Sequence, residues 1–127
     1  AIANAPDDFF SNRGILKLLP TGKYMYFTET SITLNTISYR KVTAFRFNSN
    51  GSADATFDND GQTVYTLSNL NDNIADFSIA NDGNLVFSGN ADLSFFQDRI
   101  YLCKINGNGS LNTGFSTDGK VEFFFPY

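Results

Sequence analysis

Three aspartates near the middle of the chain have side chains that could bind a hard cation. Asp54, Asp58 and Asp60 lie in the segment NSNGSADATFDNDG at residues 48–61, where oxygen-bearing side chains recur at alternate positions. Alternating oxygen donors are typical of calcium-binding loops. The matching segment NGNGSLNTGFSTDG at residues 106–119 has no carboxylate in its first half. Because hard cations require carboxylates, we predict no metal site and no cofactor, and keep the three aspartates as weak metal candidates.

The residues that the two segments share also have a structural explanation. Glycine adopts positive φ, and Asn and Asp side chains hydrogen-bond to nearby backbone, so all three are typical of tight turns. One Phe in each segment is placed to pack into a core. We therefore interpret the two segments as one corner of a structural unit that is built twice. The NGS triplets at Asn50 and Asn108 also match the N-glycosylation sequence, which would matter only in a secreted chain.

Catalytic combinations of residues are almost absent. The chain has no His, which excludes Ser-His-Asp and Cys-His arrangements. The one cysteine, Cys103, lies in the apolar run RIYLCKI, and we expect it to pack as a small hydrophobic side chain. Neighbouring carboxylates such as Asp7 and Asp8 are interpreted as solvated turn residues. The sequence therefore predicts a protein that is not an enzyme and has no catalytic residues.

Composition favours a β-sheet protein and argues against two classes of partner. The 127 residues include 14 Phe and 6 Tyr, which favour strands. The formal net charge of −4 argues against nucleic-acid binding. Arg40, Lys41 and Arg46 form the densest basic cluster, and their alternation with apolar residues predicts a strand whose charged groups reach solvent. No apolar run approaches the ~20 residues of a membrane-spanning helix, so we expect no membrane-spanning segment.

The corner segments belong to an internal repeat. Phe57 and Phe115 are separated by 58 residues, and Gly22 and Gly83, in two matching turns, are separated by 61. A shorter copy of the corner, DDFFSNRG, occupies residues 7–14. The positions that we expect to build the corners are Asp7, Phe10, Gly14, Gly51, Asp54, Phe57, Gly61, Gly109, Asn112, Phe115 and Gly119.

Short strand-like segments separate the turns, and no segment has a helical period. The expected strands are residues 15–19, 23–28, 39–48, 62–67, 74–80, 84–88, 99–106 and 120–125. This pattern predicts an all-β fold of two four-stranded antiparallel propeller-type blades. The expected division is an N-terminal arm with the remnant corner (1–14), a first blade-like repeat (15–67) and a second (68–127). A loop at residues 30–38 would account for the extra length of the first repeat.

The repeated segments resemble those of a known family. RFNSNGSADATFDNDGQTV and KINGNGSLNTGFSTDGKV are similar to the signature of bacterial delta-sixty repeats, which are usually treated as β-propeller blades. Two departures are Asp58 and Ser116, which replace the Gly that usually follows the signature Phe. The resemblance implies large bacterial surface or secreted proteins and no established activity. We therefore expect a secreted or cell-surface bacterial protein whose signal peptide has been removed.

Two blades leave sheet faces that need a cover, because repeats of this kind stabilise one another through their interfaces. The chain also ends in the apolar run KVEFFFPY. We predict a homo-oligomer, a ring or a filament, formed by head-to-tail strand complementation with other copies of the chain. The expected self-association residues are Phe123, Phe124, Phe125, Phe9 and Phe10. The alternative interpretation is a piece of a longer propeller.

A lectin-like module is the alternative function. Carbohydrate sites stack a sugar ring on an aromatic face beside polar groups, and the segment ADLSFFQD at residues 91–98 offers both. Phe95, Phe96 and Tyr101 are the candidate ligand-binding residues, and glycans the candidate ligands. Core or subunit-contact roles for the same aromatic residues stay open.

Overall fold

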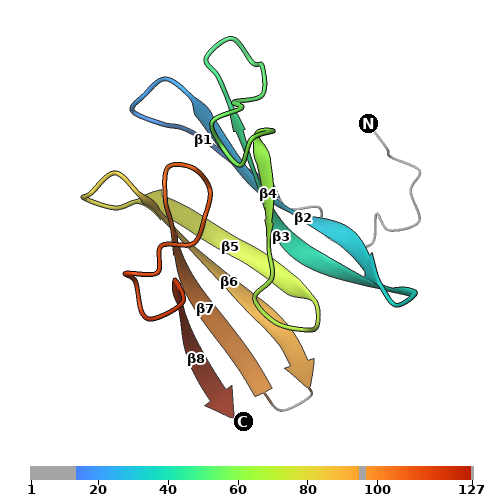
Figure 1. Cartoon of the computed structure of the whole chain (residues 1–127). Coiled ribbons are helices and arrows are strands. Elements are labelled where there is room, and N and C mark those ends of the chain that lie inside the picture. Colours follow the sequence, from blue (N-terminus) through green and yellow to red (C-terminus); the bar gives the residue numbers. More distant parts are fainter. Residues whose placement is uncertain (1–13, 95–96, 127) are drawn as a thin grey trace.

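The chain folds into two antiparallel sheets of four strands each, which lie against each other (Figure 1). The computed structural model describes residues 14–94 and 97–126. The first sheet has the order β1-β2-β3-β4 and the second the order β5-β6-β7-β8, so each strand pairs with its neighbours in sequence. The bounds are β1 (Gly14–Leu18), β2 (Tyr24–Leu34), β3 (Ile37–Phe47), β4 (Gln62–Tyr65), β5 (Asp72–Ile79), β6 (Leu85–Ser94), β7 (Gln97–Ile105) and β8 (Lys120–Pro126).

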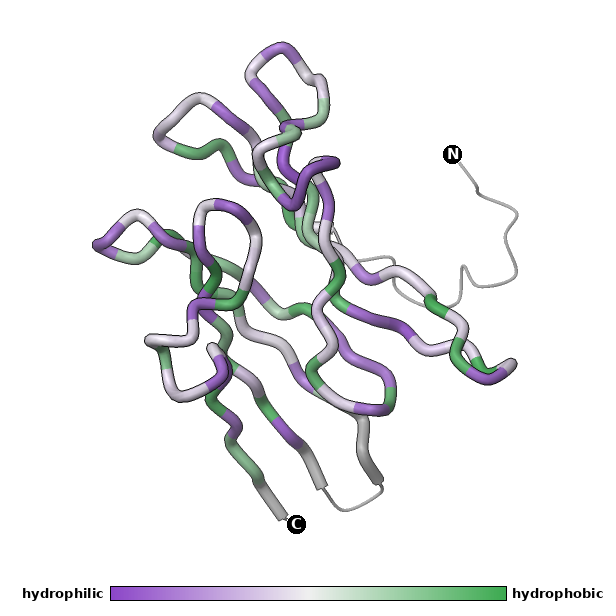
Figure 2. Tube along the Cα trace, in the orientation of Figure 1, coloured by the Kyte–Doolittle hydropathy of each residue, from purple (hydrophilic) through white to green (hydrophobic). Residues whose placement is uncertain are grey.

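The all-β class and the two four-stranded antiparallel sheets are confirmed. The described residues form no helix, and hence none that is long and apolar enough to cross a membrane. Hydrophobic and hydrophilic residues alternate along much of the strands (Figure 2), as expected for sheets with one buried face. Of the expected N-terminal arm (1–14), residues 1–13 lie outside the described part of the chain, and Gly14 begins β1.

The loop expected at residues 30–38 was wrong, because most of these residues extend β2 and β3 into one long hairpin. Its turn is the pair Asn35 and Thr36, whose φ angles are 51° and 66°. Positive φ at both central residues is the geometry of the tight hairpin turn that matches the twist of the flanking strands. A β-branched Thr is rare in that conformation, and the turn therefore escaped a search for Asn-Gly and Asp-Gly pairs.

Aromatic side chains join the two sheets. The ring of Phe27, on β2, lies 4.6 Å from that of Phe77 and 5.1 Å from that of Phe87, both in the second sheet. Tyr65, on β4, contacts Phe87 at 5.1 Å. These tilted contacts are favourable ring geometries and bury large apolar areas. The fully buried apolar residues around them include Met25, Val42, Ala44, Ile74, Cys103 and Ile105.

A buried ion pair fixes the connection between the sheets. Lys41 on β3 and Asp72 at the start of β5 are 1% and 0% exposed, and the Lys41 Nζ lies 3.2 Å from the Asp72 Oδ2. The same ammonium donates to the carbonyl oxygens of Ser68 at 2.7 Å and Leu70 at 2.6 Å. Asp72 accepts hydrogen bonds from the amide of Leu67 at 2.8 Å and the hydroxyl of Ser68 at 2.6 Å. The pair therefore holds the chain between β4 and β5 in one path.

Lys41 corrects the interpretation of the basic cluster. Its ammonium was expected to reach solvent, but the connection at residues 66–71 closes over it and supplies the acceptors that water would supply. A buried charge is tolerated only with partners of this kind.

We expect the substitution Asp72→Ala to lower the free energy of unfolding by about 3–5 kcal/mol, because it leaves the Lys41 charge buried without its counter-ion. The matched control is Asp76→Ala, which breaks the exposed Lys17–Asp76 pair and should cost much less. Urea unfolding at one protein concentration measures both. Equal effects of the two substitutions would contradict a structural role for the buried pair.

Candidate functional site

The two corner segments fold alike and lie at the same end of the two sheets (Figure 1). In the first corner (residues 48–61), the amide of Asn48 donates to the Ser52 carbonyl at 2.8 Å, and the amide of Gly51 donates to the Asn48 carbonyl at 2.9 Å. The second corner (residues 106–119) repeats both bonds. The amide of Asn106 donates to the Ser110 carbonyl at 2.8 Å, and the amide of Gly109 donates to the Asn106 carbonyl at 3.0 Å. The backbone confirms one turn design used twice.

The side chains of the corners repeat as well. The Oδ1 of Asn50 accepts from the amide and hydroxyl of Ser52, and the Oδ1 of Asn108 accepts likewise from Ser110. These are Asx-type turns, in which a side chain replaces a backbone partner. Asn50 and Asn108, considered above for glycosylation, thus use their side-chain oxygens within their own turns.

The glycine that closes each corner is required by the backbone. Gly61 and Gly119 have φ of 86° and 83°, in the region that glycine enters without strain. A Cβ on Gly61 would lie 3.2 Å from the amide nitrogen of Asp54, and one on Gly119 would lie 3.2 Å from that of Asn112. Gly14 differs, because it begins β1 beneath the ring of Tyr26 and a Cβ there would collide with that ring.

Asp54 is the most strongly bonded acid of the corners. Its carboxylate accepts from Lys23 and from the Nε of Arg46, both at 2.7 Å, and from the amide and hydroxyl of Thr56 at 3.0 and 2.6 Å. Burial by itself would raise the pKa of the Asp54 carboxyl, but the hydrogen bonds from Lys23, Thr56 and Arg46 outweigh it and hold that pKa well below its usual range. Asp54 is therefore ionised and neutralised by protein cations.

The second corner lacks this ion cluster. Asn112 stands where the first corner has Asp54, and its Oδ1 accepts from the amide of Gly114 at 2.9 Å. Lys104, in the position of Arg46, pairs at 2.5 Å with Asp82 in the β5–β6 turn. The turn bond survives the loss of the charge, because the Oδ1 of Asn112 accepts from Gly114 as the Oδ1 of Asp54 accepts from the Thr56 amide. What the Asp54 carboxylate adds is the ion pairing with Lys23 and Arg46.

The three aspartates kept as weak metal candidates do not act together. Asp60 accepts from the amide of Gln62 at 3.0 Å, and Asp58 is exposed with a φ of 50°. Within residues 14–94 and 97–126, no group of three or more His, Cys, Asp or Glu side chains is placed to hold a metal ion. The oxygen-rich sequence of the first corner is used for turn and ion-pair bonds.

Phe57 joins the first corner to the second. Its side chain is fully buried, and a Cβ on Gly109 would lie 3.1 Å from the Phe57 Cε1. The Arg46 guanidinium covers the ring, 4.8 Å from its centroid. The amide of Asp58 donates to the Asn108 carbonyl at 2.9 Å, and the Tyr65 hydroxyl donates to the Gly109 carbonyl at 2.5 Å. The corresponding Phe115 is only half-buried.

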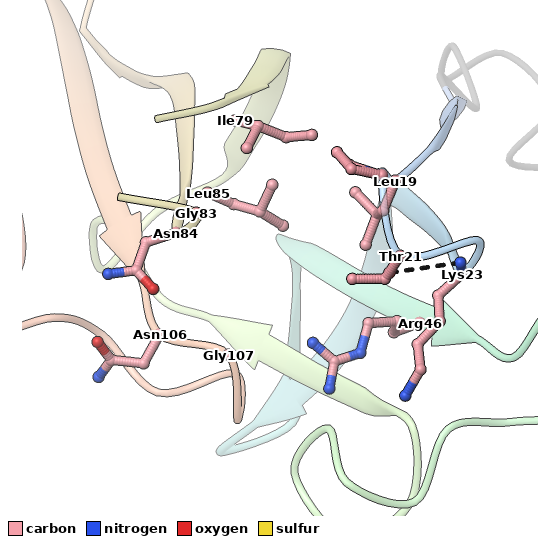
Figure 3. Close-up of a pocket in the computed structure, with 11 residues that line it drawn as sticks. Leu19, Thr21, Lys23, Arg46, Ile79, Gly83, Asn84, Leu85, Asn106 and Gly107 are labelled. Carbon is pink, nitrogen blue, oxygen red and sulfur yellow. Dashed lines mark hydrogen bonds between the residues drawn. The ribbon is translucent and has the colours of Figure 1, made fainter. Parts of the chain in front are cut away.

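A cavity of about 390 Å³ opens between the sheets at the corner end (Figure 3). Leu19 and Ile79 face each other across it, and Arg46 and Lys23 approach it from the first sheet. Leu85, Asn84 and Asn106 contribute from the second sheet. Its two cations, Lys23 and Arg46, are the ones that hold Asp54, so the charged groups of the cavity support the first corner.

The aromatic candidates differ in exposure. Phe123 and Phe124 on β8 are both 45% exposed, and Tyr101 is buried in the core, where its ring face is not open to a sugar. Phe125 pairs with Asp98 in the β7–β8 ladder, and its side chain is not described. The remaining candidates lie outside the described residues: Asp7, Phe9, Phe10, Phe95 and Phe96.

Cys103 is buried in the core between the sheets. Burial raises the pKa of its thiol to about 12, so almost no thiolate is present near neutral pH.

Sequence reasoning missed the ions that tie Asp54 to the sheet. The signal was available, because Arg46 and Lys104 occupy equivalent places one residue before the last residue of β3 and β7. A repeated cation next to a repeated corner indicates a partner nearby.

Comparison with family models, with curated proteins and with solved structures finds no match for this chain.

The substitution Asp54→Asn should lower the free energy of unfolding by about 3 kcal/mol at pH 7, because Lys23 and Arg46 lose a shared counter-ion. The native pKa is lowered, so the contribution of Asp54 is complete above its unfolded pKa of about 4 and is lost as pH falls towards the native pKa. The difference between wild type and variant should therefore shrink below about pH 4. Urea unfolding across pH measures this difference.

Asp60→Asn, which keeps an acceptor for Gln62, is the control and should change the free energy of unfolding by less than about 0.5 kcal/mol. A wild-type to Asp54→Asn difference that is constant down to about pH 2 would be incompatible with this assignment.

Cys103 should react with a thiol-specific disulfide reagent at least about a hundredfold more slowly in the folded protein than in urea, because it is buried and its thiol is protonated. Absorbance of the released thiolate measures the rate. Rapid, complete labelling without denaturant would contradict the burial.

Proposed function

We propose that this protein is a non-enzymatic structural module that associates with other copies of itself, head to tail, into a β-propeller-like ring or filament. One observation carries the proposal. The contact between the two sheets joins two different faces, and each of those faces occurs a second time with no sheet of the described residues against it. These faces are defined by matching positions in the two sheets.

The registers define the matching positions. Tyr24 pairs with Phe47 in the first sheet as Leu85 pairs with Ile105 in the second, which gives the same offsets of 61 and 58 residues as the sequence repeat. Side chains alternate between the two faces of a strand. Face A is defined in the first sheet by Met25, Phe27, Val42, Ala44 and Tyr65, and in the second by the equivalent Val86, Ser88, Ile100, Leu102 and Phe123.

Face B is the opposite face of each sheet. In the second sheet it includes Phe77, Leu85, Phe87, Cys103 and Ile105, and in the first sheet the equivalent Leu16, Tyr24, Tyr26, Phe45 and Phe47. The contact inside the chain places face A of the first sheet on face B of the second, as the Phe27–Phe77 and Phe27–Phe87 contacts show.

The exposed fractions of equivalent residues differ sharply between the covered and the open faces. Leu16 is 61% exposed, whereas its equivalent Phe77 is 2% exposed. On the other face, Phe123 is 45% exposed, whereas its equivalent Tyr65 is 5% exposed. Face B of the first sheet therefore remains apolar and open, and so does much of face A of the second.

The open face B has the character of an interface. Rings of Tyr26 and Phe45 lie 6.2 Å apart, and Phe45 and Phe47 stack at 6.4 Å, beside the exposed Leu16 and Leu18. Contiguous apolar patches of this kind are rare on the free surfaces of monomers. Inside the chain, face B of the second sheet is covered by face A of the first. A second copy offers its own open face A, on its second sheet, to the open face B of the first sheet, and is therefore the partner that fits.

Face stacking needs no exchanged strand. Each sheet already has four strands within the described residues, so we assign the association to the faces. Head-to-tail contacts between different faces generate rings when the rotation closes and filaments when it does not. The resemblance of the corners to delta-sixty repeats supports a place at the surface or outside of a bacterial cell.

We expect light scattering to find oligomers whose mass rises with protein concentration through the micromolar range. Leu18→Lys places a charge on the open face B, where Leu18 is 63% exposed, and should raise the dissociation constant at least about tenfold, the equivalent of losing most of one buried Leu. Leu70→Lys is the control, because Leu70 is an exposed Leu in the connection between the sheets and on neither face. A wild-type protein that stays monomeric at millimolar concentration would refute the proposal.

A further inference from the structure

The contact between the two corners consists of an aromatic ring from one corner and a hairpin of the other that receives it, here called the plug and the socket. The plug is Phe57, on the turn that begins at Asp54, and the socket is the hairpin at residues 106–110. The ring approaches the bare backbone of Gly109 so closely that a Cβ there would lie 3.1–3.3 Å from three of its atoms. Next to the ring, the Asp58 amide donates to the Asn108 carbonyl at 2.9 Å. The contact fixes how the two sheets align along their strands.

Each part of this contact is present a second time. The hairpin at residues 48–52 has the same bonds as the socket, and its Gly51 has a φ of 90° against 95° for Gly109. Gly51 is exposed, and no described atom lies within 4 Å of where its Cβ would be, whereas Gly109 is buried under Phe57. The first sheet thus carries a socket of the right shape that no described residue fills.

The second plug is also preformed. The amide of Phe115 donates to the Asn112 carbonyl at 2.9 Å and the amide of Gly119 to the Phe115 carbonyl at 2.9 Å, matching the bonds of Phe57 at 3.0 and 2.8 Å. Ser116 follows it with a φ of 55°, close to the 50° of Asp58. Phe115 is therefore held in the same turn as Phe57, but it is only half-buried, whereas Phe57 is fully buried.

We propose that Phe115 of one copy inserts against Gly51 of a second copy, with the Ser116 amide donating to the Asn50 carbonyl across the interface. This inference rests on the head-to-tail association proposed above and adds which residues of the two copies meet. The partner is a second copy of this chain, because the socket at residues 48–52 repeats, bond for bond, the one that Phe57 already fills. It continues the internal sheet-to-sheet interface from one chain to the next.

Two side chains that support the internal contact are not repeated in the second contact. Lys104 replaces Arg46, whose guanidinium covers the Phe57 ring, and Lys104 pairs with Asp82. Phe123 replaces Tyr65, so the hydroxyl that donates to the Gly109 carbonyl has no counterpart at Gly51. The contact between copies therefore keeps the ring and the backbone bond and lacks one hydrogen bond.

Disulfide trapping tests the register directly. Asn50→Cys and Ser116→Cys variants are prepared separately, mixed, and oxidised gently, and mass spectrometry of the digested product identifies the linked peptides. We expect the 50–116 disulfide between chains to exceed the 50–50 and 116–116 disulfides at least tenfold. The internal pair Asp58→Cys with Asn108→Cys in one chain is the geometric control, and the wild-type chain with buried Cys103 is the background control.

The outcomes separate the two proposals. Association of the wild type together with a dominant 50–116 link supports both. Association without that link overturns the plug and socket and leaves the head-to-tail proposal standing. A wild-type chain that is monomeric by light scattering overturns both.

Substitution supplies a second measurement that needs no added thiol. Phe115→Ala removes the plug and should raise the dissociation constant of association at least tenfold, whereas Thr117→Ala, in the same exposed turn, should change it less than twofold. Gly51→Ala should also weaken association. Its control is Gly83→Ala, which imposes the same strain at a φ of 86°, with nothing near its Cβ, on a turn outside both corners. Equal affinities of wild type, Phe115→Ala and Gly51→Ala would overturn the inference.

Discussion

The buried pair of Lys41 and Asp72 is the interaction on which the rest of the molecule depends. It does not belong to either sheet alone, because it ties β3 to the connection that leads into β5. Removing two charges from water is costly, and the cost is offset here because each charge also has neutral hydrogen-bond partners. What the pair contributes is one defined path between the sheets. That path places face A of the first sheet on face B of the second and brings Phe57 to Gly109.

Local chemistry made the two sheets and their corners predictable, whereas contacts between elements did not. The corners were visible because Asn-Gly and Asp-Gly turns leave the same letters each time they are used, at Gly51 and again at Gly109. Lys41 was misjudged because a lysine in an alternating strand is normally solvated, and only its acceptors at residues 68–72 reveal its burial. The long hairpin around Asn35 was missed for the opposite reason: its turn uses a Thr that local preference disfavours.

The corner also shows why a sequence pattern of oxygen donors is weak evidence for a metal. Asp54 has the position of a ligand in the sequence, but its two oxygens face Lys23, Arg46 and Thr56. A cation would have to displace the Lys23 ammonium and the Arg46 guanidinium, which already pair with the Asp54 carboxylate. The Asn at position 112 makes the same point, because the second corner keeps the fold of the first with no carboxylate to offer.

The differences between the two corners bear on how firmly copies would hold one another. Inside the chain, the corner contact has the Arg46 guanidinium over the Phe57 ring and the Tyr65 hydroxyl on the Gly109 carbonyl. Between chains, Lys104 and Phe123 take those places, and two separate molecules must also lose translational and rotational freedom on joining. The same faces that are permanent within one chain should therefore make a weaker, reversible contact between chains. An assembly built this way would gain and lose whole chains. The interface between the two sheets of one chain is more stable than the interface between neighbouring chains.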